Sequence, residues 1–390
     1  MHAYLDHAAT SLLVPEALTA MTEELGQLGN PSSLHNAGRR ARRVVEEARE
    51  QIADVYQARP SEVVFTSGGT EADNLAIKGL FWARRAADPA RRRVLVPRTE
   101  HHAVLDSVDW LASHEGAEVT WLPVSPTGRT TPDDLRAAIE RDPSSVALAS
   151  VMWANNEVGT VQPIAELAQI AREFGVPFHS DAVQAAGQLP VGLASSGATA
   201  LTITAHKIGG PVGVGALLLA RGSDPVPVLH GGGQESDVRS GTLDAPAIRA
   251  FAVAVEIAYQ RRADEAKRLA GLRDDLIAQI TAAVPDAVLN GEPPGPGRLP
   301  SNAHFSFPGC EGDALLMLLD ARDIACSTGS ACTAGIAQPS HVLLAMGADD
   351  ARARGSLRFS LGHSTTQGDI DALGAVIGEV VERARRATSR

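Results

Sequence analysis

Cysteine and aromatic residues are scarce in this sequence. The chain of 390 residues contains 3 cysteines, and Phe, Trp and Tyr make up 4% of it. A small, odd number of cysteines excludes the disulfide framework of a small secreted domain and is typical of a reducing compartment, so we expect a cytoplasmic protein. No apolar run approaches the ~18 residues of a membrane-spanning helix, and we expect no membrane partner.

Long basic runs are also missing, and the opening residues do not show the pattern of a secretory leader. The formal net charge is -11 at pH 7, which argues against a nucleic-acid-binding face. The opening residues MHAYLDHAAT lack a charged region followed by an apolar core, so we expect no signal peptide. The cysteines show no CxxC spacing and no flanking histidine cluster, so we expect no metal site.

Strand and helix patterns alternate through the first 240 residues. Residues 39–56 carry apolar side chains at three- and four-residue steps, as an amphipathic helix does, and residues 93–97 and 145–153 are short apolar strands. In 162–182, Pro163 stands at the first position of a helix, Gly175 follows its end, and a strand comes next. This alternation predicts an α/β fold with a mostly parallel sheet.

The pattern changes near residue 245, and a chain of this length has room for two domains. Long helical patterns occupy 246–260 and 265–284, and a loop rich in Pro and Gly follows them. Residues 302–309 alternate like a half-exposed strand, residues 312–321 are helical, and residues 356–362 form a strand. We therefore predict a second, smaller α+β domain.

Three motifs in the first domain can carry chemistry. TSGGTEADN (66–74) is a strand, a glycine turn and a helix start, which suits a phosphate group but also describes an ordinary strand–helix turn. Asp181 ends a buried strand, where it can meet a ligand or cap the next turn. Lys207 follows a strand and precedes a glycine-rich loop, where it is either a solvated side chain or an amine nucleophile.

The combination is more specific than its parts. A phosphate cradle, a strand-end Asp and a Lys 26 residues after it are what pyridoxal 5'-phosphate (PLP) requires. The lysine forms the Schiff base, the aspartate keeps the pyridine nitrogen protonated, and the cradle anchors the phosphate.

With these motifs in place, the sequence resembles the cysteine desulfurases of the NifS and IscS group, fold-type I PLP enzymes of the class V aminotransferase superfamily. The resemblance covers nearly the whole chain and rests on ten motifs in family order: YLDHAAT, GNPSSLH, VVFTSGGTEADNLAI, TEHHAVL, NNEVGTVQPI, HSDAVQAAG, AHKIGGPVGVGAL, HGGGQESDVRSGT, STGSACT and LRFSLG. It implies a large PLP-binding domain at 14–256 with a mostly parallel, seven-stranded type of sheet. Residues 1–13 and 257–390 would form the smaller α+β domain.

The resemblance also assigns roles to single residues. Lys207 would bind PLP covalently, Asp181 would pair with the pyridine nitrogen, and His101 would stack on the ring and move substrate protons. Gln184 would bond the phenolic oxygen of the ring, and Arg358 would bind the substrate carboxylate. The remaining implied contacts are those of Gly69, Thr70, Thr204 and His206 with the phosphate, of Asn156 with cofactor and substrate, and of Thr242 with the phosphate of the other subunit in a homodimer.

Cys332, in the loop 324–340, matches the catalytic cysteine of this family. As a thiolate it would take the sulfur of L-cysteine, with His101 as the candidate base, and release L-alanine. The persulfide would pass to an acceptor protein, such as an iron–sulfur scaffold or a thiolation enzyme. Cys326 and Cys310 have no family role, and we interpret them as small apolar residues.

Two departures and two alternatives remain at this stage. Thr204 stands where many relatives have Ser, and IGGPVG follows Lys207 where relatives often carry Tyr and a second Lys. The Thr204 hydroxyl can still bind the phosphate, and we expect the IGGPVG departure to alter the surface or partner contacts but not the chemistry. A selenocysteine lyase or another PLP-dependent C–S lyase is the alternative enzyme, and a non-catalytic sulfur-trafficking component is the alternative outside catalysis.

Overall fold

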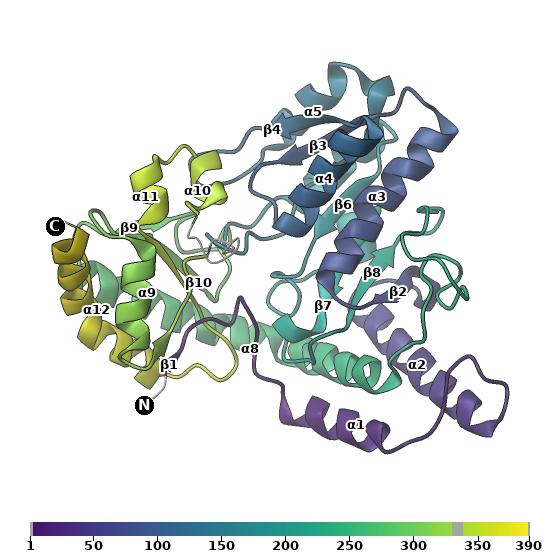
Figure 1. Cartoon of the computed structure of the whole chain (residues 1–390), viewed down its shortest axis with the longest axis horizontal. Coiled ribbons are helices and arrows are strands. Elements are labelled where there is room, and N and C mark those ends of the chain that lie inside the picture. The colour runs from purple at the N-terminus through teal and green to yellow at the C-terminus, as the bar shows by residue number, and fades with distance from the viewer. Residues whose placement is uncertain (1–2, 330–337, 389–390) are drawn as a thin grey trace.

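The computed structural model describes residues 3–329 and 338–388, and a seven-stranded sheet forms its centre (Figure 1). The order of the strands is β2 (Val63–Thr66), β8 (Gly215–Leu219), β7 (Ala200–Thr204), β6 (Phe178–Asp181), β5 (Val146–Ser150), β3 (Arg93–Pro97) and β4 (Glu118–Leu122). Only β8 runs antiparallel to its neighbours in this sheet. The predicted α/β class and mainly parallel, seven-stranded sheet are confirmed.

Helices pack on this sheet because its strands are apolar on both faces. Every residue of β2, β3, β5, β6, β7 and β8 is buried, as is typical of strands covered on two sides. The surrounding helices are α2 (Asn36–Val55), α3 (Gly69–Ala87), α4 (His102–Glu115), α5 (Pro132–Glu140), α6 (Ile164–Glu173) and α7 (Leu193–Ser196), with short 3-10 turns η1 (Pro60–Glu62), η2 (Pro143–Ser145) and η3 (Ala205–Lys207).

The predicted helix at 39–56 is α2, and the strand at 93–97 is β3. Pro163 is the N-cap of α6 rather than its first helical residue, and Gly175 follows the helix with a φ of 63°. That backbone angle favours glycine, which explains its place after the helix end.

The two long helices predicted at 246–260 and 265–284 are one helix. The 39-residue α8 (Ala245–Ala283) continues through Arg261–Asp264, because that stretch contains neither Pro nor Gly to end it. In Figure 1, α8 runs across the lower part of the molecule, above α1, from the large sheet to the small sheet described below. It packs on α1 (Pro15–Leu25) and α2 near its start and on α12 (Gln367–Thr388) near its end.

A second layer of the structure is built on a three-stranded antiparallel sheet. The order of its strands is β12 (Ser356–Ser360), β10 (Asn302–Ser306) and β9 (Val288–Asn290). Helices α9 (Gly312–Asp320), α10 (His341–Ala345), α11 (Asp350–Arg354) and α12 accompany it. The expected packing of the N-terminus here is observed, since β1 (Ala3–Tyr4) pairs in parallel with β11 (Ile324–Ala325). These elements share an apolar core that includes Leu5, Phe305 and Phe359.

The half-exposed strand predicted at 302–309 was wrong. All five residues of β10 are buried, because β10 lies between β9 and β12. Its polar side chains are buried with partners: Asn302 donates to the carbonyl of Glu157 at 2.9 Å, and His304 contacts Asn290 at 3.0 Å. Alternating polarity here reflects a buried polar face rather than a solvated one.

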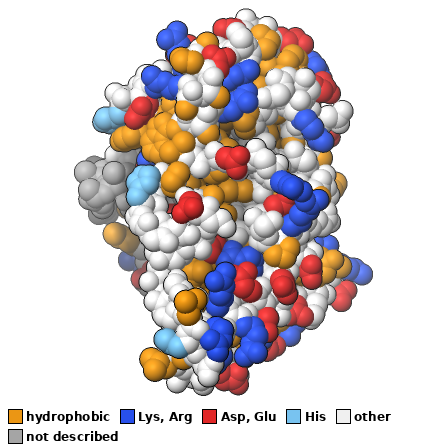
Figure 2. Space-filling view, turned by 90° about the vertical axis from the view of Figure 1, so that its right-hand side faces the viewer, with side chains coloured by type: hydrophobic (Ala, Val, Ile, Leu, Met, Phe, Trp, Pro, Cys, Tyr) orange, Lys and Arg blue, Asp and Glu red, His pale blue; other side chains and the backbone are white. Residues whose placement is uncertain are grey.

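Across the described part of the chain, no helix combines the length and the apolar character needed to cross a bilayer. The face drawn in Figure 2 carries basic and acidic side chains intermixed, with hydrophobic patches between them.

Candidate active site

A hollow of about 390 Å³ opens where β6 and β7 end, between the large sheet and the second layer. Ten of the residues predicted from the sequence line it: Gly69, Thr70, His101, Asn156, Asp181, Gln184, Thr204, His206, Lys207 and Arg358. Two do not belong to this set. Thr242 is exposed outside the hollow, and Cys332 lies outside the described residues.

The turn from β2 into α3 forms one end of the hollow. Gly68 caps α3 with a φ of 153°, a conformation that glycine adopts and other residues rarely do. A Cβ on Gly69 would lie 3.0 Å from the Val183 side chain, so the close approach of the two segments also favours glycine. The first N–H groups of a helix have no partner within it, and they favour an anion at this point.

Lys207 also lines the hollow, in η3 directly after β7. Its Nζ donates hydrogen bonds to the carbonyls of Ala8 at 2.6 Å and Ala9 at 2.7 Å. Burial lowers the pKa of Lys207 to about 8, and the Arg358 guanidinium acts in the same direction. An amine with such a pKa is partly unprotonated near neutral pH, as a nucleophile must be.

Asp181 is the last residue of β6, and one of its oxygens accepts a hydrogen bond from the backbone of Val183 at 2.9 Å. Burial raises the pKa of this carboxyl to about 6, opposed by the Val183 hydrogen bond and by Lys207. Gln184 Nε2 donates to the carbonyl of Ala8 at 2.9 Å, in the segment that also holds Lys207.

His101 is the N-cap of α4, and its Nδ1 accepts a hydrogen bond from the backbone of Ala103 at 3.1 Å. The neutral ring therefore carries its proton on Nε2. Burial among protein atoms, and next the charge of Lys207, lower the pKa of His101 to about 4, so the ring is neutral at pH 7. His206 has its pKa lowered to about 4 by the same two causes.

Arg358 closes the hollow on the side of the small sheet. It donates to Asp6 at 2.8 Å and to the carbonyl of Asn156 at 2.9 Å. Within the described residues, Arg358 Nε and Asn156 Oδ1 are buried and lack hydrogen-bond partners. Both residues line the hollow, and buried polar atoms without partners in its walls are suited to a polar ligand there.

Sequence reasoning missed three residues that line the same hollow: Asp73, Glu157 and His341. Asp73 and Glu157 lie inside motifs used above. Asp73 is one helical turn after Gly69 and Thr70, and Glu157 is the residue after Asn156, so these spacings could have indicated both. His341 Nε2 contacts the carbonyl of Glu100 at 3.0 Å across 241 positions, and no local pattern reveals that contact.

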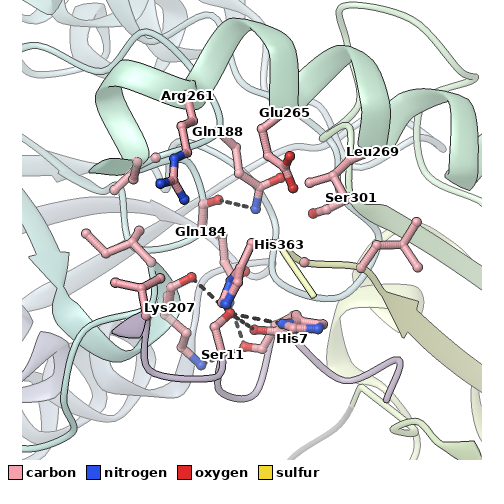
Figure 3. A pocket seen from close by; sticks show the side chains of 18 of the residues that line it. His7, Ser11, Gln184, Gln188, Lys207, Arg261, Glu265, Leu269, Ser301 and His363 are labelled. Atoms are coloured by element: carbon pink, nitrogen blue, oxygen red, sulfur yellow. Dashed lines mark hydrogen bonds between the residues drawn. The ribbon is translucent and has the colours of Figure 1, made fainter. Parts of the chain in front are cut away.

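A second hollow, of about 200 Å³, adjoins the first, and Figure 3 shows the residues that line it. Ala8, Gln184 and Lys207 line both hollows, so the segment around Ala8 separates them. Arg261 and Glu265 enter from α8, and His7 and His363 lie close to Ser11 and Lys207 in Figure 3. The N-terminal segment thus forms a wall that holds Lys207 in place.

The residues present fit PLP. The start of α3 with Thr204 and His206 provides a place for the phosphate, Asp181 provides a carboxylate for the ring nitrogen, and Lys207 provides the amine. Asn156 and Arg358 line the space that a ring and a carboxylate require.

Comparison with known proteins agrees with this chemistry. The family model of aminotransferase class-V matches residues 3–373. An IscS-like cysteine desulfurase of Mycobacterium tuberculosis is 58% identical over 385 residues, which cover 99% of this chain and 98% of that protein. A solved NifS-like protein has a TM-score of 0.90 at 33% identity and covers 98% of this chain and 100% of its own. The structure of SspA in complex with cysteine has a TM-score of 0.79 at 33% identity, with 93% and 100% covered.

The chain therefore belongs to the class-V aminotransferase family, whose cysteine desulfurases use PLP. Within that family it is a cysteine desulfurase of the IscS/NifS type.

Proposed function

We propose that this hollow removes the sulfur of L-cysteine, that Cys332 receives it as a persulfide, and that an acceptor protein takes it from there. The observation that carries the proposal is the meeting of Lys207, Asp181, His101 and Arg358 around one hollow. The described residues on either side of segment 330–337 support it, because Gly329 and His341 both line the hollow.

Lys207 is the residue proposed to bind PLP and to move the substrate Cα proton at its Nζ. Bound PLP supplies an electron sink that weakens the Cα–H and C–S bonds of the substrate. A lowered pKa of about 8 suits Lys207 to this task, since a proton-transfer group works best with a pKa near the working pH.

His101 is proposed to hold a proton at Nε2 above the ring. Its Nδ1 is engaged with the backbone of Ala103, so the neutral ring presents a donor to the hollow. This tautomer supports a proton-donating role. The base role expected from the sequence requires the ring to give up its Nε2 proton first.

Arg358 is proposed to bind the substrate carboxylate, together with Asn156. The guanidinium is oriented by Asp6 and by the carbonyl of Asn156, and its Nε remains without a partner in the described structure. A fixed guanidinium fork holds a carboxylate in one orientation, which places the substrate sulfur reproducibly.

Sulfur transfer then needs one bond exchange. The Cys332 thiolate attacks the substrate sulfur, an S–S bond forms, and the C–S bond breaks. The electron pair of the C–S bond stays with the substrate carbon, which is protonated, and the product leaves as L-alanine. Substrate thiol and enzyme thiol together become alanine and a persulfide, so no outside oxidant is needed.

A homodimer is the proposed assembly. Large apolar side chains are exposed along the N-terminal region and α1: Leu12, Leu18, Leu25, Leu28 and Leu34. Contiguous exposed apolar side chains are typical of interfaces. Thr242 is exposed on the segment after β8, as its proposed contact with the partner's phosphate requires.

The domain boundaries and the compartment also stay proposals. The boundary at residue 257 falls inside α8, between its contacts with the large-domain core at Val255 and with the small-domain core at Leu269. A cytoplasmic location is supported by the two described cysteines, Cys310 and Cys326, which are free thiols.

The deciding experiment measures alanine and sulfide released from L-cysteine by the purified protein with excess dithiol. Equal amounts of both are expected, and Cys332→Ala should release neither while it keeps the visible band of bound PLP. Cys326→Ala is the matched control and should retain full turnover. Pyruvate in place of alanine would overturn the proposal in favour of a C–S lyase that eliminates sulfide.

A further inference from the structure

A row of buried polar side chains crosses three central strands beneath α3. Ser150 of β5, His179 of β6 and Thr202 of β7 are all 0% exposed. Ser150 Oγ lies 2.9 Å from His179 Nδ1, and His179 Nε2 lies 3.0 Å from Thr202 Oγ1. The row ends at Asp73 of α3, which is 1% exposed and hydrogen-bonded by the Thr202 side chain.

The direction of these hydrogen bonds follows from Asp73. The Thr202 hydroxyl donates to the carboxyl group of Asp73, so its oxygen accepts from His179 Nε2–H. His179 Nδ1 is then left to accept from the Ser150 hydroxyl. Burial lowers the pKa of His179 to about 3, so the ring is neutral and adds no positive charge beside Asp73.

Asp73 shares its surroundings with other ionisable groups. One carboxyl oxygen of Asp73, one of Asp181 and one ring nitrogen of His101 all lie within 4.8 Å of one another. Glu100, which is 0% exposed, also raises the pKa of Asp73, and Asp181 in turn raises the pKa of Glu100. Two buried carboxyls at such a separation do not both ionise at neutral pH, because their charges repel and neither is solvated.

The surroundings decide which of the two aspartates keeps the proton. Asp181 lines the hollow, accepts a backbone hydrogen bond from Val183 and feels the charge of Lys207. Asp73 has a hydroxyl and a neutral imidazole as neighbours, and its Oδ1 has no hydrogen-bond partner among the described residues. Burial, followed by the Asp181 charge, raises the pKa of Asp73 well above its ordinary value.

We propose that Asp73, one oxygen of which lies within 4.8 Å of the Asp181 carboxyl group, is a protonated positioning residue that leaves Asp181 as the single negative charge facing the cofactor ring nitrogen. The hydrogen-bonded row Ser150–His179–Thr202 fixes the orientation of the Asp73 carboxyl group. The proposal rests on the proposed role of Asp181 and adds a residue that acts through it.

Infrared difference spectroscopy on the PLP-loaded enzyme tests the proton directly. The wild-type spectrum at pH 7.5 should contain a protonated-carboxyl band that Asp73→Asn removes. Asp106→Asn, at a site with 76% of its side chain exposed, is the control and should remove only a carboxylate band. Loss of a carboxylate band in Asp73→Asn would overturn the proposal, as would a divalent metal found in the wild type and lost from that variant. Asp73→Ser replaces Asp73→Asn if the latter does not fold.

A pH titration of the visible PLP band tests the positioning role. Asp73→Asn keeps a polar N–H donor and should leave the midpoint of the titration within about 0.3 pH units of the wild type. Asp73→Leu removes the donor and should lower this midpoint by about 0.5 pH units or more. If Asp73 were ionised, both variants would lower the midpoint equally. Asp181→Asn separates the two claims: an unaltered band in that variant refutes the role of Asp181 but leaves the infrared result on Asp73 intact.

Discussion

The Arg358 guanidinium donates a hydrogen bond of 2.8 Å to the Asp6 carboxylate. This bond joins the third residue of β12 to the N-terminal segment, 352 positions away in the sequence. The same guanidinium bonds the carbonyl of Asn156, in the loop after β5. One side chain therefore connects three parts of the chain at the mouth of the hollow. A residue fixed in this way can orient a substrate carboxylate without first losing its own rotational freedom.

Arg358→Lys should weaken substrate binding with little effect on the cofactor. Lysine keeps the charge but loses the planar fork, so two charge-assisted hydrogen bonds cannot form together. We expect KM for L-cysteine to rise about 10- to 100-fold, the equivalent of a charged hydrogen bond of about 1.5–3 kcal/mol. Steady-state kinetics with the visible PLP spectrum checks this. Arg352→Lys, whose guanidinium bonds Asn290 outside the hollow, is the control, and an equal effect in both variants would contradict the assignment.

PLP attachment to the apoenzyme should depend on pH through Lys207. Only the unprotonated amine attacks, and the pKa of Lys207 is lowered to about 8, so the rate should rise about tenfold per pH unit below pH 8 and level off above it. An ordinary lysine would show a rise up to its usual pKa near 10.5. Absorbance after mixing apoenzyme with PLP gives the rate.

The attachment site can be mapped in the same experiment, because the chain has only Lys78, Lys207 and Lys267 as lysines. Borohydride reduction followed by peptide mass spectrometry should find the PLP adduct on Lys207 alone. Lys78→Met and Lys267→Met should load normally. A stable adduct on either of those two residues in the wild type would refute the placement of the cofactor.

The local parts of this site could be predicted from the sequence. Each is a short segment whose residue types are set by its own backbone conformation or by its place at the end of a strand. Gly68 and Gly69 mark a turn that favours glycine, Asp181 ends a strand, and Lys207 follows one. The row that leads to Asp73 and the contact of His341 with Glu100 join distant segments, and no local pattern contains them. The burial of β10 was missed for a related reason: the polar face of that strand is satisfied by Asn290 and Glu157, which only the fold brings near.

A buried ion pair should hold the segment that carries Thr242. Glu235, with 1% of its side chain exposed, accepts from Arg49 at 2.7 Å and from the backbone of Phe65 at 2.8 Å. Glu235→Gln leaves the buried Arg49 without this partner and should lower the free energy of unfolding by about 3 kcal/mol. Chemical denaturation provides the measurement.

Glu46→Gln is the matched control for that pair. Glu46 bonds the same Arg49 at 3.1 Å but is 46% exposed, so its loss should cost less than about 1 kcal/mol. If Thr242 reaches the partner's phosphate, Glu235→Gln should also weaken PLP binding, and Glu46→Gln should not. Similar losses of stability in both variants would show that burial does not distinguish the two pairs.

Thiol reactivity should single out Cys332 among the three cysteines. Burial raises the pKa of Cys326 to about 12 and also raises the pKa of Cys310, so neither presents an appreciable fraction of thiolate at pH 8. Iodoacetamide should therefore modify one cysteine per chain rapidly, and mass spectrometry should place the label on Cys332. Cys326→Ala and Cys310→Ala should keep this single rapid label and full turnover, with a stability loss of about 1 kcal/mol from the lost side-chain atoms. Rapid labelling of Cys326, or a loss of turnover in Cys326→Ala as large as in Cys332→Ala, would mean that sulfur passes through both thiols, and the buried position of Cys326 would then have to open during the reaction.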